Sequence, residues 1–146
     1  RVSRITFWRP TGIWFKGANN IISFGSQNSK QFRKVLGLAP GDPRQAHHVI
    51  PWELANDANQ NVIQMAAQAR FPFHVQDVLN GIPISTLQHN GSHGIYTEKV
   101  KGALRSISLK HGNSLTPEIA YHEVVQLTNK IKEASSISIV IINYPR

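Results

Sequence analysis

Two pairs of histidines constrain this chain more than any other feature of its sequence. His47 and His48 lie within the run 45–51, which is expected to form a strand, and His89 and His93 follow downstream. Alternation along a strand would point His47 and His48 to opposite faces, so that they can take two different roles. Helical i, i+4 spacing would place His89 and His93 on one side, which suits a shared metal ion. Three ligating histidines and one remaining histidine are the arrangement expected of a metal-dependent hydrolase.

Length and composition indicate a single small domain. The chain has 146 residues, of which 40% are hydrophobic, and no apolar run is long enough to cross a bilayer. We therefore expect no membrane insertion. It contains no cysteine, so any metal must sit on histidine, aspartate or glutamate. The first residue is arginine and no signal peptide is visible, from which we expect a fragment of a larger polypeptide or a processed form.

The charge is strongly basic and unevenly distributed. Sixteen lysines and arginines face eight acids, for a net charge of +8. Eight of the cations and one acid lie in residues 1–46, whereas residues 47–90 carry one cation and three acids. A small basic protein usually meets a polyanion, most often nucleic acid. Solubility alone or contact with a membrane surface are the alternatives, but no long basic amphipathic helix favours lipid.

Hydrophobic periodicity and turn residues predict a mixed α and β chain. Short strands or extended arms are expected at 5–8, 13–16 and 21–24, further strands at 46–50 and 82–87, and a last one at 137–142. Helices are expected at 28–36 with Asn28 and Ser29 as the capping residues, at 52–70 with Trp52 or Glu53 as the first residue, and at 91–107, with one more helical turn at 75–79. A last helix is expected to begin with Thr116 as its N-cap. The turn-rich stretch 39–43 predicts a boundary between a basic appendage or linker, 1–43, and a domain at 44–146.

The predicted order places histidines at the end of one strand and at the start of the helix that follows a second strand. Three blocks carry a resemblance: residues 45–53, residues 79–84, and residues 89–93 followed by Tyr96. Together they resemble the AHH family, nucleases of the HNH/endonuclease VII superfamily found mainly as C-terminal toxin domains of bacterial polymorphic toxins. The resemblance runs from Asp42 to the last helix. It implies an α+β fold with a ββα-metal (His-Me finger) core, additional helices and a short N-terminal extended appendage.

The resemblance also implies roles for individual residues. The first histidine of the pair is similar to a metal ligand and the second to the general base, which assigns these roles to His47 and His48. Asn80 matches the middle asparagine of the family pattern, and His93 matches its terminal histidine. His89 stands where colicin-type nucleases have an additional ligand. The implied cofactor is one divalent ion: imidazoles favour zinc or nickel by affinity, while magnesium or manganese could be the working ion.

Phosphodiester hydrolysis fits these roles chemically. A divalent ion with open positions can relieve charge in the transition state and stabilise the leaving oxygen. A histidine with an ordinary pKa can deprotonate water at neutral pH, which suits His48. It works best when its other ring nitrogen is held, and the side-chain carbonyl of Asn80 is the expected partner. The superfamily implies in-line attack that leaves a 5′-phosphate.

Each assignment has a structural alternative. His47 and His48 could be strand residues whose ring nitrogens bond backbone carbonyls, and His93 could be a helix-start residue without a ligand role. Asn80, which precedes a glycine, is by default a turn residue. The residues expected to contact phosphate are Arg44, beside the motif, and Lys99, Lys101 and Arg105, on the helix that begins near His93. Any one of these cations could be merely a solvated charge.

Together these patterns predict a metal-dependent endonuclease that cleaves DNA with little sequence specificity. The resemblance implies a bacterial toxin, delivered by a secretion system as part of a larger polypeptide and active in the cytoplasm of the target cell. An acidic immunity protein would suit the cationic surface. Two alternatives stay open: an RNase of the same fold, and a noncatalytic nucleic-acid-binding module whose histidines hold a structural metal.

Overall fold

The computed structural model describes residues 3–6, 13–16, 21–24, 28–57, 59–84 and 93–137; side chains are described at 21–24, 28–57, 59–84 and 94–134. Within these ranges the chain forms the strands β1 Ser3–Thr6, β2 Ile13–Lys16, β3 Ile22–Ser23, β4 Gln45–His48 and β5 Gly81–Ile84. The helices are α1 Ser29–Val35, α2 Trp52–Ala55, α3 Asn61–Ala66, α5 His93–His111 and α6 Pro117–Ile137, with the short 3₁₀ turns η1 Val78–Asn80 and η2 Gly112–Ser114.

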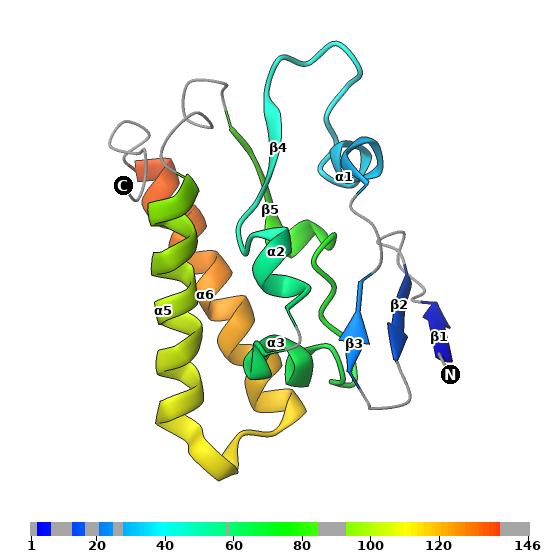
Figure 1. Ribbon diagram of the computed structural model, residues 1–146. Helices are drawn as coiled ribbons and strands as arrows, with labels where there is room; N and C mark the ends of the chain where they lie inside the picture. Colours follow the sequence, from blue (N-terminus) through cyan, green and yellow to red (C-terminus); the bar gives the residue numbers. More distant parts are fainter. Residues whose placement is uncertain are drawn as a thin grey trace.

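Two small antiparallel sheets and a set of helices make up the fold (Figure 1), which agrees with the expected α+β class. The strands β1, β2 and β3 form one sheet in that order, and β4 pairs with β5 to form the other. In this second sheet, which we call the β4–β5 pair, His47 lies opposite Ile82 and His48 lies opposite Gly81. Both histidines are thereby held in a hydrogen-bonded ladder rather than in a free loop.

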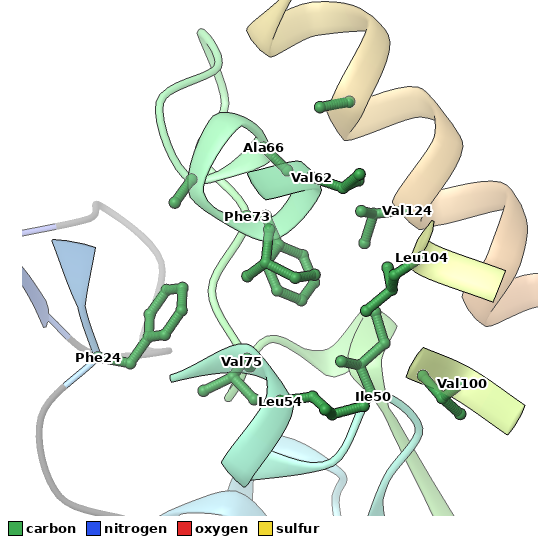
Figure 2. Packing of buried hydrophobic residues seen from close by; sticks show 14 of the residues in the cluster. Phe24, Ile50, Leu54, Val62, Ala66, Phe73, Val75, Val100, Leu104 and Val124 are labelled. Atoms are coloured by element: carbon green, nitrogen blue, oxygen red, sulfur yellow. The ribbon is translucent and has the colours of Figure 1, made fainter. Parts of the chain in front are cut away.

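Among the described residues, most of the buried apolar side chains form one core cluster (Figure 2). Phe73 is fully buried at its centre, beside Val62 of α3, Leu104 of α5 and Val124 of α6. Ile50, two residues after β4, packs into the same cluster. The end of the histidine strand is therefore anchored in the core, which limits its freedom to move.

The segment before β4 packs against this core as well. Ile22 and Phe24 belong to the core cluster, and the side chain of Gln64 in α3 holds the backbone of Ile22 through two hydrogen bonds of 2.8 and 2.9 Å. The helix α1 begins as expected with Asn28 as its N-cap, whose Oδ1 accepts from a backbone N–H of the first turn. The boundary after residue 43 stays a prediction, and these contacts cross it.

Several helix limits differ from those expected. The single helix predicted at 52–70 is wrong, because α2 ends at Ala55 and α3 begins only at Asn61. Asp57 lies between them and its Oδ1 accepts from the backbone N–H of Asn59 at 2.9 Å, so an Asx turn replaces helical bonding. The helix α6 continues through Ile137, where a strand was expected to begin; residues 138–142 lie outside the described residues. None of the described helices is both long and apolar enough to cross a membrane.

Candidate functional site

Asn80 fixes the backbone that follows the two histidines. Its side chain is fully buried, its Oδ1 accepts from the backbone N–H of Ile50 at 2.8 Å, and its Nδ2 donates to the carbonyls of Ile50 and Val75 at 3.1 and 2.9 Å. Its own carbonyl also accepts from the N–H of Val49 at 2.8 Å. The chain is thus turned into the core directly after His48, by an amide whose oxygen and nitrogen are both used.

This arrangement corrects one expected contact. Asn80 was expected to hold a ring nitrogen of His48, but its side-chain oxygen is bonded to the backbone of Ile50 instead. The residue that holds the ring is Gln76, whose Oε1 lies 2.6 Å from His48 Nε2. Asn80 holds the segment after β4 through its main chain. Its short side chain, one residue before β5, reaches the backbone of Ile50.

His48 lies on the face of the β4–β5 pair that α1 covers. Its imidazole stacks on the ring of Phe32 from α1, with centroids 3.9 Å apart and planes within 3° of parallel. Trp52 at the start of α2 meets it edge-on, with ring centroids 5.9 Å apart. Only 9% of His48 is exposed. The ring plane is therefore fixed by packing, and one ring nitrogen by a hydrogen bond.

Gln76 is itself held through its side chain and through its backbone. Its Nε2 donates to the backbone carbonyl of Asn28 at 2.9 Å, while its backbone N–H donates to Nδ1 of His74 at 3.0 Å. Gln76 is 3% exposed. Sequence reasoning missed both Gln76 and Phe32; a glutamine inside the mostly apolar stretch 73–79 is the only signal that could have drawn attention to it.

Burial lowers the pKa of His48 below the ordinary value for histidine, and the hydrogen bond to Gln76 and the charge of Glu53 oppose that shift. Desolvation disfavours the imidazolium form because a charged ring loses more hydration than a neutral one. His48 is therefore held as a neutral imidazole at neutral pH. A neutral ring is the form that can accept a proton from water or bind a metal ion.

His47 lies on the other face, beside the first turns of α5. Its ring is 5.3 Å from that of Tyr96 between centroids, and the Tyr96 hydroxyl donates to the carbonyl of Val49 directly after β4. His93 is the first residue of α5, three residues before Tyr96. The side chain of His93 and the whole of His89 lie outside the described residues, and among the side chains that are described no three histidines or acids gather as metal ligands.

The four cations expected to contact phosphate fall into different settings. Arg44 is paired with Asp42 by two hydrogen bonds of 2.7 and 3.1 Å, which lower the pKa of Asp42 to about 2. Lys101 and Arg105, one turn apart on α5, line a surface pocket of about 300 Å³ together with the loop that precedes α3. Lys99 is exposed on α5 but is not part of that lining.

Comparison with known proteins assigns the chain to a family. The family model for AHH, a nuclease family of the HNH/ENDO VII superfamily with conserved AHH, matches residues 33–134. The chain belongs to the AHH family. The AHH of the family description corresponds to Ala46, His47 and His48, the residues that β4 presents to α5 and α1. No curated protein and no solved structure matches the chain.

Proposed function

We propose that this AHH chain is a metal-dependent endonuclease that hydrolyses phosphodiester bonds of DNA with little sequence specificity. One observation carries the proposal: β4 presents two adjacent histidines to two different environments. His47 lies beside the first turns of α5, and His48 is stacked and hydrogen-bonded on the opposite face. A hydrolytic site needs this division, because a metal ligand and a general base cannot be the same imidazole.

The metal ligands in this proposal are His47, His93 and His89. Tyr96 supports the choice, because its contacts with His47 and Val49 hold the start of α5 against the end of β4. His93 precedes Tyr96 by three residues, and helical residues at that spacing share a face. The donor set is imidazole throughout, which favours zinc or nickel by affinity, while magnesium or manganese could be the working ion. Such an ion would relieve charge on the phosphate and stabilise the departing oxygen.

His48 is the base in this proposal. Its neutral form accepts a proton from the water that attacks phosphorus, and the stack on Phe32 keeps its ring plane constant while it does so. Asn80 fixes the backbone on which both histidines stand. The β4–β5 pair followed by α5 would then be the ββα-metal core of the superfamily. Lys101 and Arg105 supply cations for the substrate backbone, with Lys99 and Arg44 as further contacts.

A direct experiment tests the proposal. Purified protein is incubated with plasmid DNA and, separately, with structured RNA, in EDTA and in a series of divalent ions. We expect DNA to be nicked and then degraded with a metal present, and no cleavage in EDTA. Cleavage of RNA alone would make the chain an RNase of the same fold. Binding without cleavage of either polymer under any ion would favour a noncatalytic nucleic-acid-binding module.

We also propose that the chain is the toxin domain of a larger secreted polypeptide, delivered to the cytoplasm of a target bacterium and neutralised in the producer by an acidic immunity protein. The net charge of +8 supports an acidic partner, because complementary charge speeds association. Expression inside a bacterium without an immunity protein should stop growth, and the variant His48→Ala should not. Normal growth with the wild-type chain expressed in folded form would overturn the toxin role.

A further inference from the structure

Gln76 joins His48 to the segment before α1 in a short chain of hydrogen bonds. One end of its amide meets the ring of His48 at 2.6 Å, and the other end donates to the carbonyl of Asn28 at 2.9 Å. His48 and Gln76, which form these hydrogen bonds, are both buried. Asn28 is exposed and contributes only its main-chain oxygen. In a hydrogen bond that is shielded from water in this way, the group that donates and the group that accepts stay the same.

The direction follows from the chemistry of the amide. A backbone carbonyl can only accept, so the end of Gln76 that faces Asn28 must be the NH₂ group. The end that faces His48 is then the carbonyl oxygen, which can only accept. His48 must therefore donate from Nε2. In a neutral imidazole only one ring nitrogen carries hydrogen, so the lone pair lies on Nδ1.

We propose that Gln76 is the positioning residue that fixes His48 in its Nε2–H tautomer, leaving Nδ1 as the atom that takes the proton from the attacking water. This inference rests on the proposed role of His48 as the base. Phe32 completes the arrangement, because a ring stacked at 3.9 Å prevents the imidazole from tilting out of its plane. Gln76 acts through His48 and needs no contact with the substrate.

A spectroscopic measurement tests the tautomer without any use of activity. Two-dimensional ¹H–¹⁵N multiple-bond spectra distinguish Nδ1–H from Nε2–H, and the His48 signals are assigned by their loss in His48→Ala. In wild-type protein, at a pH well above the ordinary pKa of histidine, we expect the Nε2–H pattern alone. In Gln76→Met we expect a mixture of both tautomers, because methionine offers no comparable acceptor. An Nδ1–H pattern in the wild type would overturn the inference.

A matched control separates positioning from packing. Gln64 is a second buried glutamine whose amide also bonds main-chain groups, but it holds Ile22 and does not contact His48. We expect Gln64→Met to lower the midpoint of thermal unfolding as much as Gln76→Met does, yet to leave the His48 tautomer unchanged. Gln76→Glu keeps an acceptor toward His48 but loses the donor toward Asn28, so Nε2 of His48 should stay protonated although the protein becomes less stable. If Gln76→Met does not fold, loss of the Nε2–H signal in Gln76→Glu would overturn the inference.

Kinetics give the second readout. We expect Gln76→Met to lower kcat about 10- to 100-fold with KM little changed, by analogy with the effect of removing a group that orients a metal-ligating histidine. Gln76→Glu should restore most of kcat, and Gln64→Met should keep the wild-type value. Equal kcat in Gln76→Met and Gln64→Met would overturn the inference. If the wild-type protein cleaves no nucleic acid, the proposed function fails, while the tautomer spectra still decide the role of Gln76.

Discussion

On one face of the β4–β5 pair His47 lies beside a tyrosine of α5, whereas on the other face His48 is stacked on a phenylalanine of α1 and bonded to Gln76. We call these the α5 face and the α1 face. The α5 face brings together groups that suit an ion, namely an imidazole and the start of a helix that carries another histidine. The α1 face brings together groups that fix one ring in one orientation. Adjacent residues of a strand can thus serve different chemistry because the strand separates their surroundings.

The largest expected difference between the faces comes from removing each histidine. His48→Ala should lower the rate of DNA cleavage by about 10²- to 10⁴-fold, the usual contribution of a general base, and should leave metal binding intact. His47→Ala should instead weaken metal binding, and its cleavage should recover partly at high metal concentration. Initial rates of plasmid nicking and calorimetric metal titration measure the two effects.

His122→Ala is the control for this pair, because His122 is an exposed histidine on α6. It should match the wild type in both measurements. If His47→Ala and His48→Ala lose metal affinity equally, the two faces do not divide the work and both histidines are ligands.

A methyl group at Gly81 should disturb the α1 face alone. A Cβ at this position would lie 2.5 Å from Leu36 Cδ2 and 2.7 Å from Phe32 Cζ. Phe32 cannot retreat without leaving its stack on His48, so Gly81→Ala should lower the free energy of unfolding by about 1–3 kcal/mol and slow cleavage, with metal affinity kept. Denaturant unfolding measures the stability. Gly41→Ala, where a Cβ meets nothing within 4 Å, should change neither property.

Removing the hydroxyl of Tyr96 should disturb the α5 face by a smaller amount. Tyr96→Phe keeps the ring against His47 but leaves the carbonyl of Val49 without this donor. We expect a loss of about 0.5–1.5 kcal/mol in unfolding free energy and a modest fall in metal affinity. Tyr121→Phe on α6 serves as the control, since the Tyr121 hydroxyl forms no hydrogen bond with the residues described. A larger loss of cleavage than of metal affinity in Tyr96→Phe would contradict the assignment of this face.

The smallest effects concern the cations around the two faces. Lys101 and Arg105 form no ion pair with any described residue, so the double change to glutamine should reduce the salt dependence of DNA binding by roughly one per phosphate contact removed. Arg44→Gln should have less effect, because Asp42 already pairs with Arg44. Binding isotherms over a salt series measure this, with Lys130→Gln as the control. A slope that falls by about one in Arg44→Gln alone would show that pairing with Asp42 does not keep Arg44 from the phosphate backbone.

The ion pair between Asp42 and Arg44 stays formed throughout the neutral pH range. The folded-state pKa of Asp42 is lowered to about 2, so its pairing with Arg44 is complete above the ordinary carboxyl pKa and is lost only as the pH falls through the lowered value. Asp42→Asn removes the pair at any pH and should strengthen DNA binding a few-fold at most. Unchanged binding in Asp42→Asn would indicate that Arg44 does not reach the substrate.

The sequence predicts the local parts of this structure well. Asn28 as a helix cap, the strand at 13–16 and the opposite faces of His47 and His48 all follow from short-range patterns, and each is found. Thr116 likewise caps α6 by accepting from the N–H of Ile119. These features depend on neighbours within a few residues, so the sequence contains all the information that they require.

The contacts between distant segments could not be predicted. Gln76 lies 28 residues from His48, and Phe32 comes from a helix that the sequence assigned to an appendage. Asn80 was recognised as part of the site, but its partner was not, because the choice between a ring and a backbone N–H depends on tertiary packing. The break between α2 and α3 was missed because the apolar periodicity continues through it while Asp57 and Asn59 end the helical bonding.

The hydrogen bond between Gln76 and Asn28 spans 48 residues of sequence and has a practical consequence for trimming the protein. A fragment that begins at Arg44 would retain all four histidines of the motif but would lack both the Phe32 ring and the Asn28 carbonyl. Its His48 ring would lose the stack on Phe32, and Gln76 would lose the hydrogen bond that orients its amide. The presence of the four histidines would therefore not be enough to make the fragment active. The shortest fragment that keeps the surroundings of His48 is therefore set by these contacts between distant segments, and it must begin no later than Asn28.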